Sequence, residues 1–421
     1  RMVGGHQMGH IYIGAIGLIT TYFFHGMENA KNLVQNCTNC GACTSQCAFL
    51  KEYGTPAEML STYDFRHSDH QRKAFECSLC RLCTAVCPEK LDPSHFYLLA
   101  RKEAVSVGRV NLSIYKGLLA YEKKGNSSLF SWYGLPRGCD TVFFPGCTLS
   151  GTRSRTTWKM FTHLQKTVPS LGVVLDCCNK ISHDLGRQDH FKSMFKQMRD
   201  ILKKHQIQKV LVACPNCYKM FNTHGNGIKV ETVWEVIGHA ALPDTAHGHG
   251  KLLVHDPCPL RYEKGIQKTV RSLVSGMGMN VEKIHNQEQR TLCCGEGGSV
   301  GCVRPDLART WGLTRQQQAS GHTLLTYCAG CAEFLNRLTP TIHLADLIFD
   351  TQNTLSGHFK IARTPFTYLH RIQLKNQFKK HLAPAVQHVR PSEPKNLCFQ
   401  NKLIKMFVSK VLKLKTQNGG T

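Results

Sequence analysis

The spacing of the cysteines constrains this chain more than any other feature of its sequence. There are 21 cysteines among 421 residues, and eight of them form two runs with one shared pattern. In each run, two residues separate the first cysteine from the second and the second from the third, and three residues separate the third from the fourth. The runs are Cys37, Cys40, Cys43 and Cys47, followed by Cys77, Cys80, Cys83 and Cys87. Thiolates at this spacing can reach neighbouring metal atoms from one short loop, so the sequence predicts metal centres.

The same pattern is typical of bacterial ferredoxins with two clusters, in which the fourth cysteine of each run binds the other cluster. We therefore expect two [4Fe–4S] clusters with crossed ligands. One would be held by Cys37, Cys40, Cys43 and Cys87, and the other by Cys77, Cys80, Cys83 and Cys47. Zinc is the alternative, but zinc ribbons use two Cys-x-x-Cys pairs and not two runs of four.

Disulfide bonds explain the cysteine content poorly. Disulfide-rich scaffolds are usually short, have an even number of cysteines and are exported behind a signal peptide. This chain is long, its cysteine number is odd, and residues 1–12 do not read as a signal peptide. We therefore expect a reducing, cytoplasmic environment. The longest apolar run, Ile11 to Phe24, is too short to span a membrane and is expected to be a buried segment.

Ten further cysteines belong to an internal repeat. Each copy contains a single cysteine, then an adjacent pair, then a Cys-x-x-Cys motif. The first copy has Cys147, Cys177, Cys178, Cys214 and Cys217, and the second has Cys258, Cys293, Cys294, Cys328 and Cys331. Corresponding cysteines are 111 to 116 residues apart, which indicates a duplication. These ten residues are the predicted metal ligands of the repeat, with zinc in one copy as an alternative.

Short apolar segments lead into four of these cysteines. Residues 141–144, 209–212, 252–254 and 323–327 have the pattern of buried strands, each with its cysteine just past the C-terminal end. Amphipathic stretches such as 191–205 lie between the strands. This alternation predicts parallel α/β sheets, whose ligands bind beyond the carboxyl ends of the strands. We expect two α/β halves that face each other across a pseudo-twofold axis.

The predicted fold class is α/β, with a helical, ferredoxin-like dicluster domain before the two repeats and a basic tail after them. The expected divisions are a leader (1–36), the dicluster domain (37–105), a helical linker (106–138), the repeats (139–248 and 249–350) and the tail (351–421). The turn-forming Gly134-Leu135-Pro136 is expected to end the linker. Because the sequence begins with Arg1, we expect it to start within a longer protein, with the leader as the end of an upstream domain.

The repeat resembles the cysteine-rich CCG domain of heterodisulfide reductase, which also occurs in subunits of glycolate, glycerol-3-phosphate and lactate oxidation systems. The resemblance covers about residues 37–350. It implies one or two further, non-cubane [4Fe–4S] clusters, held by the five-cysteine sets, and cleavage of a disulfide between these sets. Cys178 and Cys294 are then the candidate catalytic residues. Asn179 stands where the second copy has Gly295, so the second site is expected to be the more sensitive to mutation.

The leader shows a separate resemblance. Its segments Gly4-Gly5-His6, Phe24-His25-Gly26 and Ala30-Lys31 resemble part of the lactate-utilisation iron–sulfur proteins. In that family, the corresponding part follows an upstream cysteine run and a larger N-terminal domain. This resemblance favours an alternative function, as the iron–sulfur subunit of a complex that oxidises lactate or another 2-hydroxy acid.

The formal net charge of +25 is concentrated near the C-terminus. From His358 onward there are 13 lysines and arginines and a single acid, Glu393. Residues 401–415 place apolar side chains on one helical face and lysines mostly on the other, which predicts a helix that binds an anionic membrane surface or docks onto a partner. A solvated tail is the simpler alternative. A zinc-stabilised, basic nucleic-acid-binding module is a further alternative, which predicts a colourless protein with salt-sensitive binding.

The main interpretation is an iron–sulfur electron-transfer subunit of an anaerobic oxidoreductase similar to heterodisulfide reductase. The sequence shows no flavin or nicotinamide fingerprint. The expected partners are therefore a flavoprotein or another redox subunit and a membrane quinone or cytochrome subunit, without nucleic acid. We expect the protein to be cytoplasmic, either free or peripheral on the inner membrane face. His183-Asp184 and His255-Asp256 flank the two sites and are expected to supply protons to a departing thiolate.

Overall fold

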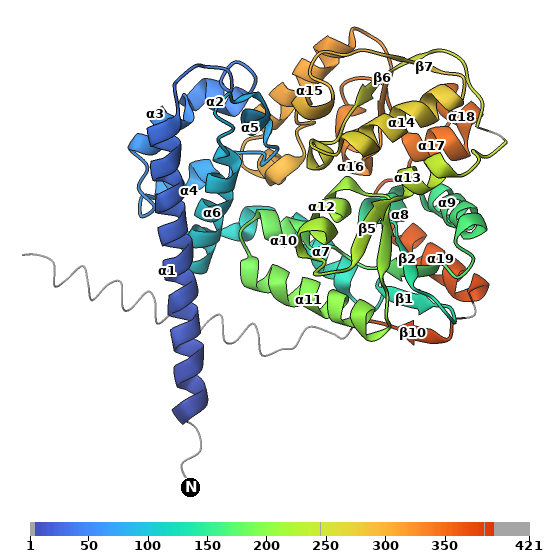
Figure 1. Ribbon diagram of the computed structural model, residues 1–421, viewed down its shortest axis with the longest axis horizontal. Coiled ribbons are helices and arrows are strands. Elements are labelled where there is room, and N and C mark those ends of the chain that lie inside the picture. Colours follow the sequence, from blue (N-terminus) through green and yellow to red (C-terminus); the bar gives the residue numbers. More distant parts are fainter. Residues whose placement is uncertain (1–4, 245, 383, 391–421) are drawn as a thin grey trace, which may run out of the picture.

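The computed structural model describes residues 5–244, 246–382 and 384–390, with side chains from Thr21 onward. A helical part comes first and two α/β parts follow it, as Figure 1 shows from blue through green and yellow to red. The predicted order of a helical domain before two α/β domains is therefore confirmed. None of the described helices is long and apolar enough to cross a membrane.

The helical part begins with the long helix α1 (Gly5–Asn36), which ends one residue before Cys37. Five short helices follow: α2 (Ala48–Tyr53), α3 (Pro56–Ser61), α4 (Ser68–Ala74), α5 (Leu82–Val86) and α6 (Pro93–Ser106). Helix α1 packs against α3 and α6, and its Leu33 shares one core with Phe49, Phe65 and Phe96. The C-terminal turns of the predicted leader are therefore part of the helical fold that carries the first two cysteine runs.

The first α/β part is a six-stranded sheet with the order β10-β1-β3-β2-β4-β5. Strands β2 (Thr141–Phe144), β3 (Gly172–Leu175), β4 (Lys209–Val212) and β5 (Lys229–Thr232) are parallel to one another. The helices of this part are α8 (Cys147–Thr152), α9 (Ser154–Thr167), α10 (Lys180–Asp184), α11 (Gln188–Lys204), α12 (Pro215–His224) and α13 (Val233–His239). Both strands that the sequence predicts in this repeat occur at the predicted residues.

The second α/β part is a four-stranded parallel sheet with the order β7-β6-β8-β9. Its strands are β6 (Lys251–His255), β7 (Asn280–Glu282), β8 (Leu324–Thr326) and β9 (Thr341–His343). Its helices are η2 (Cys258–Leu260), α14 (Lys264–Gly276), η3 (Glu288–Arg290), η4 (Gly297–Cys302), α15 (Pro305–Ala319), α16 (Ala329–Leu335) and α17 (Leu344–Phe349). This strand order repeats β3-β2-β4-β5 of the first sheet, as the predicted duplication requires.

Two of the expected divisions differ from the structure. The region between the helical part and the first repeat contains η1 (Leu112–Tyr115) and α7 (Lys116–Asn126), but it ends in strand β1 (Trp132–Leu135) and not in a turn at Gly134. Strand β1 pairs antiparallel with β3 on one side and with β10 (Val386–His388) on the other. Trp132, Tyr133 and Leu135 are buried, and their burial favours a strand over the expected turn.

The expected tail also begins later than predicted. Helices α18 (Thr351–Leu355) and α19 (Phe366–His381) fold back onto the α/β parts, and β10 completes the first sheet. Phe378 of α19 packs in the core between Trp158 and Phe161. This apolar contact outweighs the basic composition that suggested a solvated segment. The predicted basic helix at 401–415 lies outside the described residues.

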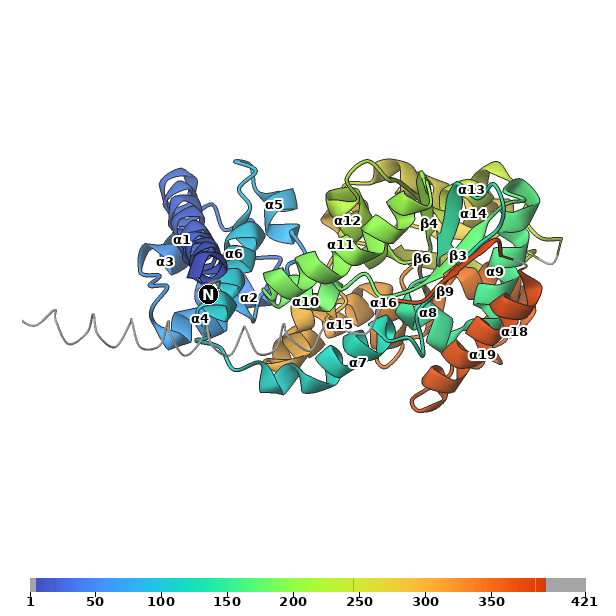
Figure 2. The ribbon, with the colours of Figure 1, turned by 90° about the horizontal axis from the view of Figure 1, so that it is seen from below.

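The two α/β parts share one apolar core, which contains Trp234 of α13, Val270 of α14 and Leu347 of α17. A buried ion pair, Arg153 Nε to Asp346 Oδ2 at 2.6 Å, also joins them. Figures 1 and 2 both place α10 of the first part and α15 of the second part beside the helical part. The three parts therefore meet in one region, and the cysteines lie around it.

Candidate metal centres

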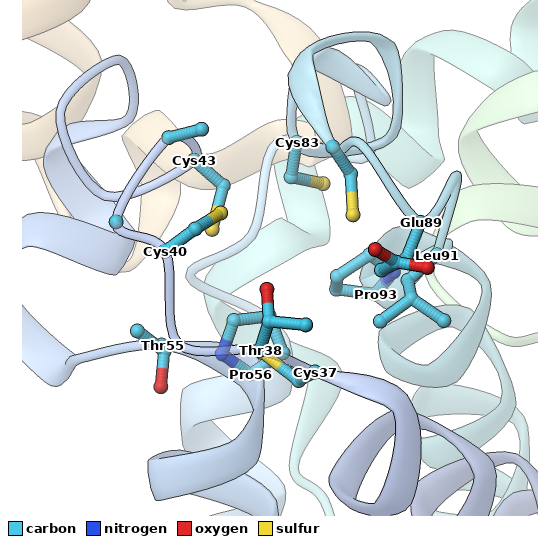
Figure 3. A pocket seen from close by; sticks show the side chains of 13 residues that line it. Cys37, Thr38, Cys40, Cys43, Thr55, Pro56, Cys83, Glu89, Leu91 and Pro93 are labelled. Atoms are coloured by element: carbon cyan, nitrogen blue, oxygen red, sulfur yellow. The ribbon is translucent and has the colours of Figure 1, made fainter.

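The outer set comprises four of the five cysteines that line one cavity: Cys37, Cys40, Cys43 and Cys87, with Cys83 of the second run also at its wall. The cavity lies between the loop after α1 and the start of α6, and Figure 3 shows Cys37, Cys40, Cys43 and Cys83 around it. Cys40 is exposed to solvent, whereas the other three are partly buried. Burial, with a smaller effect of the nearby Cys37, raises the pKa of Cys43 to about 11. The outer set therefore lies near the molecular surface.

The inner set comprises the other four cysteines of the two runs: Cys47, Cys77, Cys80 and Cys83. These residues pack around the core of the helical part. Burial, followed by the neighbouring Cys80, raises the pKa of Cys47 to about 12, and burial also raises the pKa values of Cys77 and Cys83. Grouped, buried thiols lose their protons together when metal cations replace them, so both sets have the chemistry of a metal centre.

The two cysteine runs share a backbone conformation. The second and fourth residues after the first cysteine have positive φ in both: Asn39 (53°) and Gly41 (73°), then Leu79 (54°) and Arg81 (61°). Such alternation turns successive N–H groups toward one side and forms a concave anion site. In the second run, the Leu79 N–H donates to the Cys77 Sγ atom at 3.4 Å. The loops are therefore shaped to surround an anionic, sulfur-rich group.

The first five-cysteine set lies beyond the carboxyl ends of β2, β3 and β4. Its thiols are in mutual contact: Cys147 hydrogen-bonds with Cys177, and Cys217 hydrogen-bonds with Cys178 and Cys214. The chain between β2 and α8 passes close to them at Gly146. A Cβ atom added at Gly146 would lie 3.0 Å from the Cys214 Cβ atom and 3.4 Å from the Cys217 Sγ atom.

The second five-cysteine set lies in the corresponding place, beyond the carboxyl ends of β6 and β8. Cys293 hydrogen-bonds with Cys258 and Cys294, and Cys331 hydrogen-bonds with Cys294 and Cys328. Hydrogen bonds from Cys293 and Cys331 lower the pKa of the Cys294 thiol to about 7. The five cysteines of each repeat thus lie together, and the assignment of individual cysteines to individual clusters stays a prediction.

The residue after each cysteine pair differs between the sets. Gly295 has φ = 107°, and a Cβ atom there would lie 2.4 Å from the Ala308 carbonyl oxygen and from the Phe334 ring. Asn179 also has positive φ, at 55°, a conformation that asparagine tolerates. Its Nδ2 donates to the Cys177 carbonyl at 2.8 Å, and its Oδ1 accepts from Asn126 at 2.6 Å. The first set therefore reaches a similar turn through side-chain hydrogen bonds.

Sequence reasoning missed a group of buried arginines beside the cysteines. Arg371 lies near Cys147 of the first set, Arg315 near Cys294 and Cys331 of the second, and Arg101 near Cys77 of the inner set. Each is at most 5% exposed. Arginine is the cation best suited to burial, and these side chains offset the negative charge of thiolates. The distribution of charge along the sequence did not reveal them. Arg371, for example, lies in the segment that was expected to be a basic tail.

Two buried arginines, Arg101 and Arg261, and one glycine pair attach the inner set to the second five-cysteine set. Arg261 donates from Nε to the Cys80 carbonyl at 2.9 Å and from Nη2 to the Thr291 carbonyl at 2.7 Å. Arg101 donates to the carbonyl oxygens of Cys77, Asp184 and Gly298, one from each part of the molecule. Close packing completes the junction.

The glycine pair Gly297-Gly298 forms that close packing. A Cβ atom at Gly297 would lie 2.7 Å from the Ser78 carbonyl oxygen and 3.1 Å from the Cys293 Sγ atom. A Cβ atom at Gly298 would lie 2.6 Å from the Cys77 carbonyl oxygen. Only glycine allows the inner-set loop to approach Cys293 this closely, so the two sets are direct neighbours.

The two five-cysteine sets face each other. Helix α12 packs against η2, and α10 packs against η4. Glu296 of the second part lies against Gly330 and near Cys214 of the first part. Lys180 of the first part lies near Cys178 and also near Cys258 of the second part. Desolvation by the surrounding protein, with a smaller effect of the nearby Cys214, raises the pKa of Glu296 to about 7. Part of its side chain is nevertheless exposed to solvent.

The two histidines predicted as proton donors lie close to the sets but are poorly suited to that role. His183 Nδ1 lies 2.9 Å from Asp184 Oδ1, and burial lowers the pKa of its imidazole. Burial lowers the pKa of His255 to about 3, so this imidazole is neutral near pH 7. Lys180, which forms an ion pair with Asp184, is a charged donor that lies near a cysteine of each set.

Comparison with protein families identifies the parts. Residues 36–92 match a 4Fe–4S dicluster domain, and residues 141–222 and 252–336 each match a cysteine-rich domain called CCG. The chain carries a 4Fe–4S dicluster domain and two CCG domains. Cysteine thiolates are the usual ligands of iron–sulfur clusters, so the donor sets described above fit the family matches. The dicluster domain holds the outer and inner sets, and each CCG domain holds one five-cysteine set.

Curated relatives match about 72% of the chain at low identity. An uncharacterized iron–sulfur protein of Methanocaldococcus jannaschii is 22% identical over 72% of this chain and 68% of its own length. One of the fumarate reductase (CoM/CoB) subunits of Methanothermobacter marburgensis is 22% identical over 72% of this chain and 68% of its own. One of the dihydromethanophenazine:CoB–CoM heterodisulfide reductase subunits of Methanosarcina mazei is 22% identical over 72% and 88%.

A shorter match supports the second resemblance found in the sequence. Lactate utilization protein B of an Exiguobacterium species is 45% identical over 47 residues, which are 11% of this chain and 10% of that protein. The similarity lies at the N-terminus, where the leader was predicted to resemble this family.

Proposed function

We propose that this chain is the iron–sulfur electron-transfer subunit of an oxidoreductase similar to heterodisulfide reductase, and that it reduces a disulfide between its two CCG domains. One observation carries the proposal: the inner set adjoins Cys293 of the second five-cysteine set, and that set faces the first. The four sets therefore form a continuous series from the exposed Cys40 to the first five-cysteine set.

Two [4Fe–4S] clusters would be held by the outer and inner sets, and a non-cubane [4Fe–4S] cluster by one or both of the five-cysteine sets. When bound, these clusters supply one-electron transfer. The chain contributes the spacing between them, because Arg101 and Arg261 fix the inner-set loop against the second CCG domain. Buried arginines near the sets balance the thiolate charge. The outer set, being nearest the surface, is the entry point for electrons from a partner.

Reduction of a disulfide requires two electrons and two protons, and it yields two thiols when the sulfur–sulfur bond breaks. Two facing sets can each supply one electron, so no free sulfur radical has to leave the space between them. Glu296 and Lys180 both lie between the sets and carry dissociable protons. We infer that these two side chains hold the protons that the departing thiolates take up.

The test compares cysteine variants of the anaerobically purified chain. Cys178→Ser and Cys294→Ser should abolish disulfide reduction with reduced methyl viologen while leaving the EPR signals of the dicluster domain unchanged, and the second site should be the more sensitive. Cys302→Ser is the matched control, because Cys302 lies in η4 but in neither set. Full turnover of Cys294→Ser with every candidate disulfide would reduce the CCG pair to a structural or relay role.

In that case, the iron–sulfur subunit of a lactate or other 2-hydroxy-acid oxidation complex would become the leading function. The match to lactate utilization protein B favours it, although this match covers only 11% of the chain. Electron delivery from a reduced flavoprotein partner distinguishes the two functions. Only the disulfide function requires a disulfide substrate between the two five-cysteine sets.

The proposed partners are a flavoprotein or another redox subunit at the outer set and a membrane quinone or cytochrome subunit. Several of the relatives are named as subunits, which supports a multi-subunit assembly. We further propose that the protein acts in the cytoplasm or on the inner membrane face. Liposome flotation with and without residues 396–421 tests this, and equal flotation of the two forms would remove the membrane association.

A further inference from the structure

The second five-cysteine set contains one side chain that the first lacks. His255 is the last residue of β6 and precedes Cys258 by three positions. Phe144 holds the corresponding position at the end of β2, three residues before Cys147. The duplicated fold therefore has an imidazole at one site where the other has a phenyl ring.

His255 lies among the thiols of its set. One of its ring nitrogens and the sulfur atoms of Cys294 and Cys331 lie within 4.8 Å of one another, and all three residues are buried. The sheet register explains this proximity, because His255 pairs with Thr326, two residues before Cys328. An imidazole nitrogen together with thiolates is a ligand combination that both zinc sites and iron–sulfur proteins use.

The imidazole has no other partner among the described residues. His255 is 0% exposed, and neither of its ring nitrogens makes a hydrogen bond there. Unpaired polar groups are rare in protein cores and indicate a bound group when they occur at a site. Phe144 shows that an apolar ring fills the same position in the first CCG domain, so packing alone does not require a histidine.

The charged groups around His255 are occupied elsewhere. Arg315 donates to the carbonyl oxygens of His285 and Asn286, and Arg261 donates to backbone carbonyls on two loops. Asp256 receives two hydrogen bonds from Arg271, at 2.9 and 2.8 Å. The Arg315 Nε and Thr326 Oγ1 atoms are also unpaired, but neither makes a hydrogen bond with the imidazole. The thiols of Cys294 and Cys331 are the metal-binding groups that lie beside it.

We propose that His255 is a nitrogen ligand to an iron atom of the centre held by the second five-cysteine set, beside Cys294 and Cys331. This proposal rests on the proposed function, since it requires an iron–sulfur centre in the second CCG domain. It makes the two facing centres chemically different, with nitrogen ligation at the second and sulfur alone at the first. Imidazole in place of thiolate raises the reduction potential of an iron–sulfur centre. The centre next to the inner set would therefore accept electrons more readily.

The test uses the full chain, purified anaerobically with natural or ¹⁵N-labelled histidine and reduced with dithionite. Pulsed EPR should show a strongly coupled nitrogen whose frequency changes with the label. The coupling should disappear in His255→Phe, which copies the residue of the first site, and the midpoint potential of the second centre should fall. The labelling arm needs no variant, so it remains decisive if His255→Phe does not fold.

His163→Phe is the matched control. His163 is another buried histidine with an unpaired ring nitrogen, but it lies on α9 and packs against Phe349. This variant should keep both the coupling and the potential. Any one of three results would overturn the proposal: a nitrogen coupling that is weak in the wild-type chain, a coupling that is unchanged in His255→Phe, or zinc in place of iron at the second set.

Iron and sulfide contents separate this inference from the proposed function. If Cys293→Ser with Cys294→Ser lowers both contents, the second CCG domain holds a cluster and the nitrogen coupling tests His255 alone. If the double variant retains the wild-type contents, no cluster is bound there and the proposed function fails together with the inference.

Discussion

Cys47 is the residue at which the crossed ligand assignment can be tested most directly. It follows the loop of the outer set, but it packs with the inner set, where Cys80 acts on its thiol. Replacing it by serine should therefore remove a ligand from the inner cluster and leave the outer cluster largely intact. EPR of the reduced chain measures this, with Cys139→Ser as the control outside all four sets. A loss confined to the cluster of Cys37, Cys40 and Cys43 would contradict the crossed assignment.

Gly295 is the second residue with a specific expected effect. Gly295→Ala would force a Cβ atom to within 2.4 Å of the Ala308 carbonyl oxygen at φ = 107°, so the turn after Cys294 cannot keep its shape. We expect loss of the iron bound by the second CCG domain, measured as iron per chain. Gly321→Ala is the control: it has φ = 81° with open space around it, and a left-handed alanine costs only about 1–2 kcal/mol. Equal iron contents in the two variants would contradict this reasoning.

At this scale, the sequence could predict the ligands but not their surroundings. Cysteine spacing is local, so it identifies Cys37 or Cys214 without knowledge of the fold. The role of Arg371 depends on the return of α19 to the first CCG domain, and that of Arg101 on three parts meeting at one guanidinium. Such long-range contacts leave no local pattern in the sequence.

At the scale of secondary-structure elements, Arg304 connects α2 of the dicluster domain with the start of α15. It binds Glu52 through two hydrogen bonds, of 3.0 and 2.9 Å, and Asp306 at 2.7 Å. The hydrogen bonds from Arg304 lower the pKa values of both carboxyl groups. Their contribution is therefore complete above the unfolded-state values of about 4.3 and 3.9 and is lost as the pH falls through the lower folded-state values.

Arg304→Gln should accordingly loosen α2 more at pH 7 than at pH 3. The expected difference at pH 7 is less than about 1 kcal/mol, because these side chains are partly exposed and the pairs are screened. Hydrogen exchange of the α2 amides, labelled at both pH values and corrected for intrinsic rates, measures it. A difference that stays constant between pH 7 and pH 3 would exclude the two carboxylates as its source.

Strands with strong apolar patterns were the predictable elements. The segments at 141–144 and 209–212 are buried and β-branched or aromatic, and the structure places β2 and β4 there. Strand β10, Val386–His388, has a single apolar residue and is held by pairing with β1. Strand β1 itself carries a glycine and borders a proline, so its turn-like composition concealed it. Strands β1 and β10 are therefore stabilised by pairing with their neighbours more than by their own sequences.

Over the whole molecule, the C-terminal segment is expected to be necessary for the first CCG domain. Arg390 forms a buried ion pair with Asp176 at 3.0 Å, directly before Cys177, and Arg371 lies near Cys147. A chain that ends at residue 350 should lose the iron of the first set, whereas a chain that ends at residue 390 should keep it. Iron content and EPR of the two purified chains provide the measurement. Equal iron in both would show that β10 and α19 are dispensable.

The position of β10 also has a consequence in time. The strands of the second sheet leave the ribosome in one uninterrupted series, so that sheet can close as soon as β9 has emerged. The first sheet begins earlier but waits for residues 386–388, which are synthesised after the entire second domain. During translation, the later domain is therefore completed before the earlier one. Iron delivery to the nascent chain would follow the same inverted order, with the second CCG domain ready for its cluster first.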